Sequence, residues 1–401
     1  MPLPQRVRRA SGLLIQPRER VDLDLASLLC GGSGVRAVTD WIAYAPHLGK
    51  AVEIDAKQLM ALAHVEQGRW CEVTAVMAQV DADVLQGLFD HGLVIGPDDD
   101  SDAAHGDANL RSIPWENLAV VAHTFARWEG VGDGEDILQT RHAGMLSLVE
   151  KHGPAPPHLH ARVPEFARLP LPQHAPSALD DLLRSRVTCR NFDKSAILPR
   201  AALAAVLQRS FACQAQMQVL PGAWLAKKNH PSGGSLHPLE AYLVLRNVED
   251  VADGLYHYHA GDHALEPLQA VSGDEAEAMA RRFVAGQDFF SDAQAQIIIA
   301  PRFLRTFWKY RAHPKAYRVV TLEVGHVAQN TYLAAAESGL GAYVTAAINE
   351  IDIEKAFGLE PLQESPIAVC GVGVRSRQRE RVELDPLGRV WPLDAETEQP
   401  G

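Results

Sequence analysis

The sequence has no long apolar run and no paired cysteines, and each absence excludes a class of protein. No stretch approaches the roughly eighteen uninterrupted apolar residues of a membrane helix. The basic N-terminus is not followed by an apolar segment long enough for a signal peptide. The five cysteines are odd in number, widely scattered and free of any C-x-x-C pair, so neither a disulfide framework nor a zinc site is indicated. We therefore expect a cytoplasmic protein with no membrane partner and no metal.

Basic residues are also in the minority. Lysine and arginine number 38 against 50 aspartate and glutamate, which gives a formal charge of -12. A surface that binds nucleic acid normally shows a basic excess, so we expect no nucleic-acid partner. The 401 residues, 47% of them hydrophobic, are enough to bury a large core and to form two or three domains.

A proline-rich stretch divides the chain. Six prolines fall between about 155 and 178, and because proline removes amide donors and fixes φ, this stretch should be extended and irregular. We place an N-terminal winged-helix-like and helical region at 1–150, a linker at 151–179 and a C-terminal domain at 180–401.

The N-terminal part has the pattern of a helix-turn-helix followed by a wing. Apolar residues recur at helical spacing over 84–89, Gly92 ends that helix, and 93–95 reads as a short strand. The last helix carries Asp81, Asp83 and Asp90 instead of basic residues, which disfavours phosphate contact. A scaffold or dimerisation element and a peptide-docking role both stay open. Residues 106–150 look helical.

The C-terminal part opens with "LLRSRVTCRNFD". Arg186 and Arg190 lie four residues apart with the hydroxyl of Thr188 between them. Two guanidinium groups offer forked donors to phosphate oxygens, and a hydroxyl adds a hydrogen bond, so the trio can hold a phosphate. The alternative is a solvated charged turn.

A rigid loop follows in "KKNHPSGGSLHPLEAYLVLRN". Adjacent glycines let the backbone approach a flat ligand, and Ser232 and Ser235 supply hydroxyl groups. A plain hairpin connection into the strand 241–245 is the alternative. The loop matches neither G-x-G-x-x-G nor the phosphate loop G-x-x-x-x-G-K-[ST], so no motif supports a dinucleotide-binding fold or a nucleoside triphosphatase.

Three further stretches carry chemical groups. In "TFWKYRAHPKAYR" (306–318), lysines and arginines crowd around aromatic residues. A helical stripe from Val320 to Thr331 predicts a deeply packed helix that stops at Gly339 and turns through "GLGA" into a strand. The buried-type strand of "SPIAVCGVGVRSRQR" ends in arginines, which could meet phosphate or form an exposed charged tail.

Together these motifs resemble the flavin-dependent nitroreductase superfamily, and within it the SagB/McbC-type dehydrogenases that oxidise azolines in modified peptides. The resemblance rests on "RVTCRNF", "HPSGGSLHPLEAYLVL", "WKY", "AYRVVTLEVGHVAQNTYLAAAESGLGA" and "VCGVGVR" in this order, over roughly residues 180–377. It implies an α+β fold with a mixed sheet wrapped by helices, an intimate homodimer, and FMN bound at the subunit interface. Winged-helix-like N-terminal extensions are familiar in this group.

The resemblance also implies site residues. Arg186, Thr188 and Arg190 match the flavin-binding R-x-S-x-R segment, with Val187 where a second basic residue is usual, which leaves the phosphate clamp one contact short. Arg375 is an expected phosphate ligand. The residues expected along the flavin ring are Pro231, Ser232, Gly233 and Gly234 on one side and Gly339, Leu340 and Gly341 on the other. The pair Lys309 and Tyr310 matches the pair regarded as catalytic in the azoline-oxidising branch.

The implied function is oxidation of azolines to thiazoles or oxazoles in a ribosomally made precursor peptide, after a partner cyclodehydratase has formed the rings. Removal of a hydride to the flavin and of a proton from the adjacent carbon requires a base, which Lys309 and Tyr310 would supply. Without the resemblance, Lys309 reads as a surface residue and Tyr310 as a packed aromatic. The alternatives are a nitro or quinone reductase driven by NAD(P)H, and a flavin-free scaffold subunit that binds a leader peptide.

Overall fold

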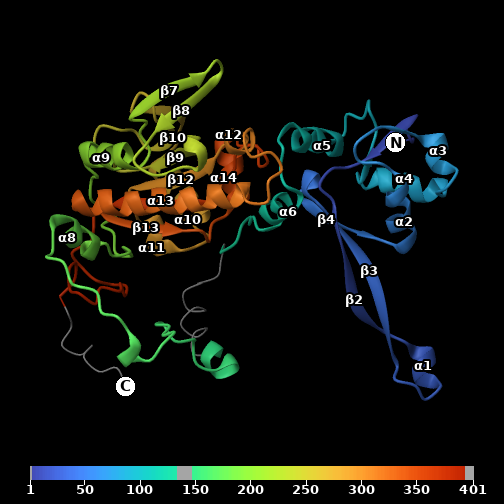
Figure 1. Cartoon of the computed structure of the whole chain (residues 1–401), viewed down its shortest axis with the longest axis horizontal. Coiled ribbons are helices and arrows are strands. Elements are labelled where there is room, and N and C mark those ends of the chain that lie inside the picture. The colour runs from blue at the N-terminus through green and yellow to red at the C-terminus, as the bar shows by residue number, and fades with distance from the viewer. Residues whose placement is uncertain (1, 133–146, 393–401) are drawn as a thin grey trace. The chain divides into compact units, whose positions relative to one another are not determined.

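A computed structural model describes residues 2–132 and 147–392, and contacts divide the chain into two units (Figure 1). The first unit comprises Met1–Arg127, Arg302–Val320 and Leu359–Ser365. The second comprises Trp128–Pro301, Thr321–Gly358 and Pro366–Gly401. These units cut across the ranges that we predicted, because two short segments from the C-terminal half pack with the N-terminal part. The predicted helical stretch 106–150 runs partly into 133–146, which lies outside the described residues.

The first unit is built on a small helical core with a three-stranded sheet. The strands follow the order β5-β1-β6, with β1 antiparallel to both neighbours. The apolar core lies between this sheet and the first helices, as expected for a winged-helix-like module. The bounds are β1 Arg6–Arg9, α2 Ala56–His64, β5 Cys71–Glu72, α3 Val73–Met77, α4 Ala82–Asp90 and β6 Val94–Ile95.

Local residues set the helix ends of this module. Asp55 caps α2 in a capping box with Gln58, which satisfies two terminal amides. Gly92 has φ +72°, the left-handed conformation that ends α4 and that glycine adopts without strain. The predicted strand at 93–95 forms as β6.

A long hairpin was not predicted from the sequence. β2 and β3 pair over ten residues, and β4 adds to β3 to give the order β2-β3-β4. Hydrogen bonds across the hairpin satisfy the backbone, while many side chains of β2 stay exposed. The remaining bounds in this unit are β2 Leu14–Leu23, α1 Leu25–Leu29, β3 Val35–Ala45, η1 Pro46–Leu48, β4 Lys50–Ile54, α5 Asp102–Ser112, α6 Asn117–Phe125 and α12 Phe303–Phe307.

The second unit is organised by a six-stranded sheet in the order β11-β10-β9-β12-β14-β13. Its named strands are antiparallel, and Thr188 adds a parallel bridge to Ala342 of β13, so the sheet is mixed as predicted. A separate hairpin, β7–β8, projects from the unit (Figure 1). The strands are β7 Ala215–Leu220, β8 Ala223–Lys227, β9 Leu239–Leu245, β10 Gly254–His259, β11 Ala264–Ala270, β12 Ala295–Pro301, β13 Gly341–Thr345 and β14 Ala368–Gly373.

Helices cover the sheet, which gives the predicted α+β fold. Buried residues of α10, α11 and α14 pack with inward-facing residues of β9, β12, β13 and β14 in one apolar cluster. Thr331 of α13 bonds Ser210 of α9, and Tyr332 of α13 accepts the amide of Val344 in β13. The helices and turns of this unit are η2 Glu165–Ala167, α8 Ala178–Ser185, α9 Arg200–Ser210, η3 Gly233–Ser235, α10 Gly273–Phe283, α11 Asp288–Ser291, α14 Glu350–Phe357 and, from Thr321 onward, α13 Ala316–Glu337.

The predicted long helix is present as α13. Val320, Val324, Val327 and Thr331 are buried on one stripe, as their spacing predicts. The helix ends before Gly339, which has φ +70° and is followed by β13. The proline-rich stretch 151–179 is exposed, and its regular structure is limited to two helical residues at 151–152, the turn η2 and the start of α8. Over the described residues, no helix combines the length and the apolar character needed to cross a membrane.

We predict that Gly371→Ala destabilises the protein and that Gly325→Ala does not. A Cβ at Gly371 would lie 1.8 Å from a ring carbon of Tyr343, whose ring stacks on Phe290 with centroids 4.0 Å apart. Such overpacking should lower the free energy of unfolding by about 1–3 kcal/mol. Gly325 lies in α13 with open space around it, so alanine there should raise stability by about 1 kcal/mol. Denaturant unfolding measures both, and equal effects would contradict the packing of β13 on β14.

Candidate cofactor site

The segment 186–190 runs beside β13 as an extra strand. Cys189 donates its amide to the carbonyl of Ala342 at 2.8 Å, next to the parallel bridge from Thr188. Val187 and Cys189 are buried, while Arg186, Thr188 and Arg190 are half-exposed, so the segment alternates with the period of a strand. The arginines and the threonine therefore share the outward face, as their candidate role requires.

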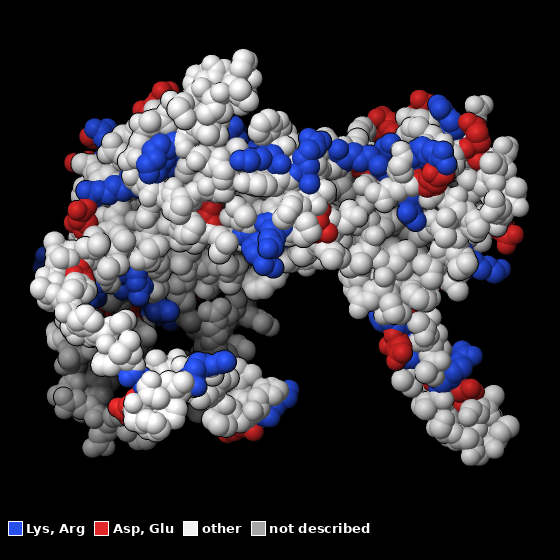
Figure 2. All heavy atoms as spheres, viewed as in Figure 1, with Lys and Arg blue, Asp and Glu red and all other residues white. Residues whose placement is uncertain are grey.

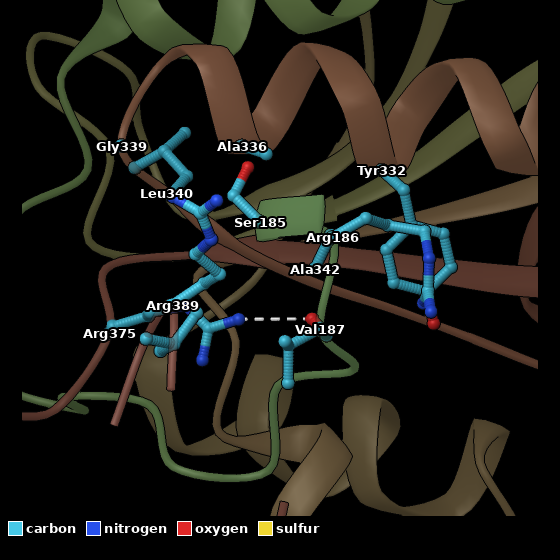
Figure 3. Close-up of a pocket in the computed structure, with 11 residues that line it drawn as sticks. Ser185, Arg186, Val187, Tyr332, Ala336, Gly339, Leu340, Ala342, Arg375 and Arg389 are labelled. Carbon is cyan, nitrogen blue, oxygen red and sulfur yellow. Dashed lines mark hydrogen bonds between the residues drawn. The ribbon is translucent and has the colours of Figure 1, made fainter. Parts of the chain in front are cut away.

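A cavity of about 250 Å³ brings together predicted residues from three parts of the chain (Figure 3). Its lining includes five of them, namely Arg186, Val187, Gly339, Leu340 and Arg375. It also includes Ser185, Tyr332 and Arg389, which the sequence analysis did not single out. Three guanidinium groups and a hydroxyl around a small cavity form a donor set suited to an anion such as phosphate. We call this the arginine cavity.

A larger cavity of about 890 Å³ is lined by Thr188 and Arg190. Phe289 and Phe290 contribute aromatic lining, and Tyr332 lines both this cavity and the arginine cavity. A concave site with apolar walls and a few polar groups is typical of small-molecule sites, and this volume lies in their usual range of about 300–1,000 Å³. We call it the aromatic cavity.

Tyr332 connects the two cavities and was missed by the sequence analysis. Its hydroxyl lies 2.9 Å from the Thr188 hydroxyl and accepts the amide of Val344 at 3.1 Å. The guanidinium carbon of Arg186 lies 5.3 Å from the centroid of its ring. Burial raises the pKa of Tyr332, so its phenol stays protonated. The residue holds Thr188 and Arg186 in place, and only its spacing within a buried helix hinted at it.

Arg375 is a structural residue as well as a lining residue. It donates to the carbonyl of Val187 at 3.0 Å, the dashed contact in Figure 3, and to the carboxylate of Glu383 at 2.8 Å. These bonds use both terminal nitrogens of its guanidinium. The predicted ligand therefore has a fixed position at the wall of the arginine cavity.

Glu383 is the anchor of this region and was also missed. Its fully buried carboxylate accepts from the amides of Arg190 and Asn191, the Asn191 side chain, Arg375, and the indole of Trp391 at 2.8 Å. Burial alone raises the pKa of Glu383, but these hydrogen bonds and the charge of Arg375 outweigh it, so the net pKa is lowered. The carboxylate is therefore ionised and links the strand 186–190 to the segment that contains Arg389.

The two glycines of the turn 339–341 are required for different physical reasons. Gly339 has φ +70° with nothing near its missing Cβ, so it is needed for its backbone conformation. A Cβ at Gly341 would lie 2.5 Å from the sulfur of Cys189, so it is needed for close packing of β13 on the strand 186–190. Gly339 and Leu340 line the arginine cavity, whereas Gly341 supports it from behind.

The loop Pro231–Gly234 is fixed by α13. Ser232 donates to Glu323 at 2.5 Å and accepts the amide of His237 at 2.9 Å, and Gly234 has φ +70°. Burial raises the pKa of Glu323, but hydrogen bonds from His230, His237 and Ser232 outweigh it and lower the pKa to about 2. Among the described residues, the lining of the two cavities does not include this loop. Its predicted contact with a flavin ring stays a prediction.

Lys309 and Tyr310 belong to the first unit. They follow α12 in a turn in which both amides bond the carbonyl of Thr306. The ammonium of Lys309 lies 5.4 Å from the centroid of the Tyr310 ring, and Lys309 is exposed. The pair is thus adjacent and accessible, and its catalytic role stays a prediction.

An aromatic cluster supports this turn. Trp115 packs against Phe303, Phe307 and Tyr317, with ring centroids 4.6, 4.7 and 5.7 Å away. His123 completes the cluster, and burial lowers its pKa to about 4, so the ring is neutral. Part of the cationic and aromatic stretch 306–318 therefore forms a core, while its charged residues lie at the surface. On the face shown in Figure 2, basic side chains lie among uncharged and acidic ones.

Comparison with known proteins identifies the family of the C-terminal half of the chain. A sequence model of the nitroreductase family matches residues 183–374. The predicted nitroreductase MJ1384 of Methanocaldococcus jannaschii is 34% identical over 147 residues, which are 36% of this chain and 70% of that protein. The chain belongs to the nitroreductase family. The resemblance predicted from the five motifs is confirmed, and with it the fold class.

Two other relatives of this nitroreductase-family chain are processing proteins. The trifolitoxin-processing protein TfxB of Rhizobium leguminosarum is 30% identical over 143 residues, covering 35% of this chain and 38% of TfxB. The microcin B17-processing protein McbC of Escherichia coli is 28% identical over 162 residues, covering 37% of this chain and 54% of McbC. The chain thus matches about half or less of each.

Solved structures give weaker similarities. A chain of the E. coli microcin synthetase McbBCD complex with truncated pro-MccB17 bound aligns with a TM-score of 0.45 at 19% identity, covering 67% of this chain and 97% of that chain. A nitroreductase-like structure from Ralstonia eutropha aligns with a TM-score of 0.40 at 24% identity, covering 52% and 89%.

We predict that Glu383→Gln loosens the cofactor site. The change removes a buried charge that faces Arg375 and places an amide donor among other donors, so the free energy of unfolding should fall by about 3 kcal/mol. Because folding lowers the pKa of Glu383, its stabilisation is present above the pKa of an unfolded glutamate and is lost as pH falls through the folded pKa. As pH is lowered, the free energy of unfolding of the variant should therefore fall less than that of the wild type.

Thermal unfolding between neutral and acidic pH measures this difference. Glu380→Gln is the control, since Glu380 is exposed and only its backbone amide bonds Asn191. A Glu383→Gln protein as stable as the control at neutral pH would contradict the anchoring role.

Proposed function

We propose that the protein is an FMN-dependent dehydrogenase that oxidises azolines to azoles in a ribosomally synthesised precursor peptide. One observation carries the proposal: the R-x-T-x-R strand contributes to an arginine cavity and an aromatic cavity that share Tyr332. The similarity to the trifolitoxin- and microcin B17-processing proteins supports a role in peptide maturation. A cyclodehydratase partner would supply the azoline rings.

The arginine cavity suits the phosphate of FMN. Arg186 and Arg389 line it beside Arg375, whose charge Glu383 already partly offsets. Forked guanidinium donors match phosphate oxygens. The Val187 carbonyl, which accepts from Arg375, keeps the strand close to these donors. Arg186 and Arg389 would therefore provide the main anion contacts, together with the Ser185 hydroxyl.

The aromatic cavity suits the flavin ring system. Phe289 and Phe290 supply apolar walls, while Thr188, Arg190 and Gln287 supply hydrogen-bonding groups. When bound, FMN supplies the hydride acceptor of the oxidation. The residues of this cavity would orient the ring and exclude water from it.

Lys309 and Tyr310 would handle the proton. Aromatisation of an azoline releases a hydride and a proton from neighbouring atoms, so two hydrogens leave each ring. One side chain of the pair would accept the proton, and its neighbour would hold it in place. An acceptor such as oxygen would then reoxidise the flavin.

Exposed apolar residues support a homodimer that completes the site. Val382 and Leu384 line the aromatic cavity and are 75% and 82% exposed, so apolar surface lies open at its edge. A second copy that packs on this edge would bury them and close the cavity. This agrees with the expectation that FMN lies between subunits.

We predict that Arg186→Ala weakens FMN binding by about ten- to a hundredfold. The variant loses a charge-assisted hydrogen bond to phosphate worth about 1.5–3 kcal/mol. Flavin absorbance after dialysis, with light scattering to follow the dimer, measures the effect. Arg184→Ala is the control, because Arg184 is exposed on α8 and outside the cavity lining. Unchanged flavin content in Arg186→Ala would refute the phosphate site, and a colourless wild type would favour a flavin-free scaffold.

We predict that Lys309→Ala and Tyr310→Phe slow azole formation by about 10²- to 10⁴-fold, the usual share of general acid-base catalysis. Both variants should stay folded and keep their flavin, because neither residue lies in the second unit that holds the cavities. Mass spectrometry of an azoline peptide, which loses two mass units per ring, gives the rate.

Lys315→Ala is the matched control, since Lys315 is an exposed lysine of the same stretch. Wild-type rates in Lys309→Ala and Tyr310→Phe would show that the pair is not catalytic. Rapid bleaching of the flavin by NAD(P)H, with no oxidation of an azoline peptide, would instead favour a nitro or quinone reductase.

A further inference from the structure

A buried cluster of two histidines and a glutamate lies outside both cavities. His230 and His237 flank the loop Pro231–Gly234, and Glu323 comes from α13. The exposed fractions of their side chains are 1%, 5% and 2%. The sequence analysis used the loop but not its histidines.

Three side-chain atoms of this cluster converge on one point. The Nε2 atom of His230 lies 3.2 Å from Oε1 of Glu323 and 3.2 Å from Nδ1 of His237. The Nδ1 atom of His237 lies 3.5 Å from the same Oε1 of Glu323. The three atoms therefore form a nearly equilateral triangle.

Protons satisfy this triangle only in part. The Nε2 atom of an imidazole has one in-plane position, so it either donates or accepts. If His230 donates to Glu323, it cannot accept from His237, and if it accepts from His237, its lone pair faces a carboxylate oxygen. Within the described residues, Nδ1 of His230 is buried without a hydrogen-bond partner, so the ring depends on its Nε2 contacts. One short contact between like groups is left in every arrangement.

A metal ion would satisfy all three atoms at once. Zinc binds histidine nitrogen and carboxylate oxygen at about 2.0–2.2 Å in a tetrahedron, whose edge is about 1.6 times the bond, or about 3.3–3.6 Å. The observed separations of 3.2, 3.2 and 3.5 Å fit this edge. An octahedral magnesium ion, with bonds of about 2.0–2.1 Å, would need edges near 2.9 Å and prefers oxygen ligands.

The backbone of the loop gives a second observation. His237 has φ +46° and Ser235 has φ +54°, which are unfavourable for residues with a side chain. Strained residues persist only where their surroundings hold them, and they gather at functional sites and ligand clamps. His237 keeps this backbone conformation while its ring lies against Glu323, with Nδ1 3.5 Å from Oε1.

We propose that His230, His237 and Glu323 bind one zinc ion, which fixes the loop Pro231–Gly234 to α13. Two imidazoles and one carboxylate are three of the ligands that zinc takes in proteins, and water or the Ser232 hydroxyl would fill the fourth position. The expectation of no zinc site rested on the cysteines alone. A loop tied in this way would stay in one conformation beside the proposed flavin site.

Metal analysis of the intact protein tests this proposal without reference to its activity. The protein is purified without a metal-affinity step, and its zinc content is measured by plasma mass spectrometry. We expect about one zinc per chain, or a single saturable site when metal-free protein is titrated with ZnCl₂ in a calorimeter. If the purified protein contains no zinc and the metal-free protein shows no saturable uptake of one equivalent, the proposal is overturned.

Variants locate the site. Glu323→Gln keeps the size of the side chain and removes its charge, so zinc affinity should fall by more than about tenfold. His257→Asn is the matched control, because His257 also contacts two carboxylates, Glu240 and Glu266, but through different ring nitrogens that do not converge. Zinc affinity that is unchanged in Glu323→Gln, or lost equally in His257→Asn, would place any bound metal elsewhere. Zinc binding can also be measured on flavin-free protein, so the result does not depend on whether the proposed dehydrogenase function is correct.

Discussion

The cofactor site depends on one buried negative charge, the carboxylate of Glu383. A buried ion costs several kcal/mol to desolvate, and only full hydrogen bonding and a nearby opposite charge offset this cost. Glu383 has both, since Arg375 and Trp391 bond one oxygen and the amides of Arg190 and Asn191 bond the other. The carboxylate thereby fixes the strand that carries the arginines and the C-terminal segment that returns to it.

The same charge explains how several arginines can lie close together. Three guanidinium groups around one small cavity repel one another. Glu383 offsets Arg375, while Arg186 lies over the ring of Tyr332, whose electron-rich face favours a cation. The remaining positive charge is what an anionic ligand would neutralise. The apolar core on the other side of the strand, formed by Val187 and Cys189, keeps these charges at the surface of the sheet.

The local elements could be predicted from the sequence, and the long-range partners could not. The helix stop at Gly92, the stripe of α13 and the stop at Gly339 all follow from periodicity and backbone preference. Glu383 sits in a run of charged residues that looks solvated, so nothing local marks it as buried. Tyr332 and Arg389 likewise gain their roles only when distant segments meet. The packing of Trp115 is long-range in the same way, because its partners Phe303 and Phe307 lie almost two hundred positions later in the chain.

The proposed cofactor residues and the proposed catalytic pair belong to different units. A hydride acceptor and a base must both reach the same azoline ring, and catalytic geometry tolerates little displacement. The cavities belong to the second unit, whereas Lys309 and Tyr310 belong to the first and rest on the aromatic cluster around Trp115. Flavin binding would then depend on residues of the second unit, while turnover would also depend on Lys309 and Tyr310. Disruption of the packing around Trp115 would therefore slow turnover without weakening cofactor binding, although no residue of that cluster carries out chemistry.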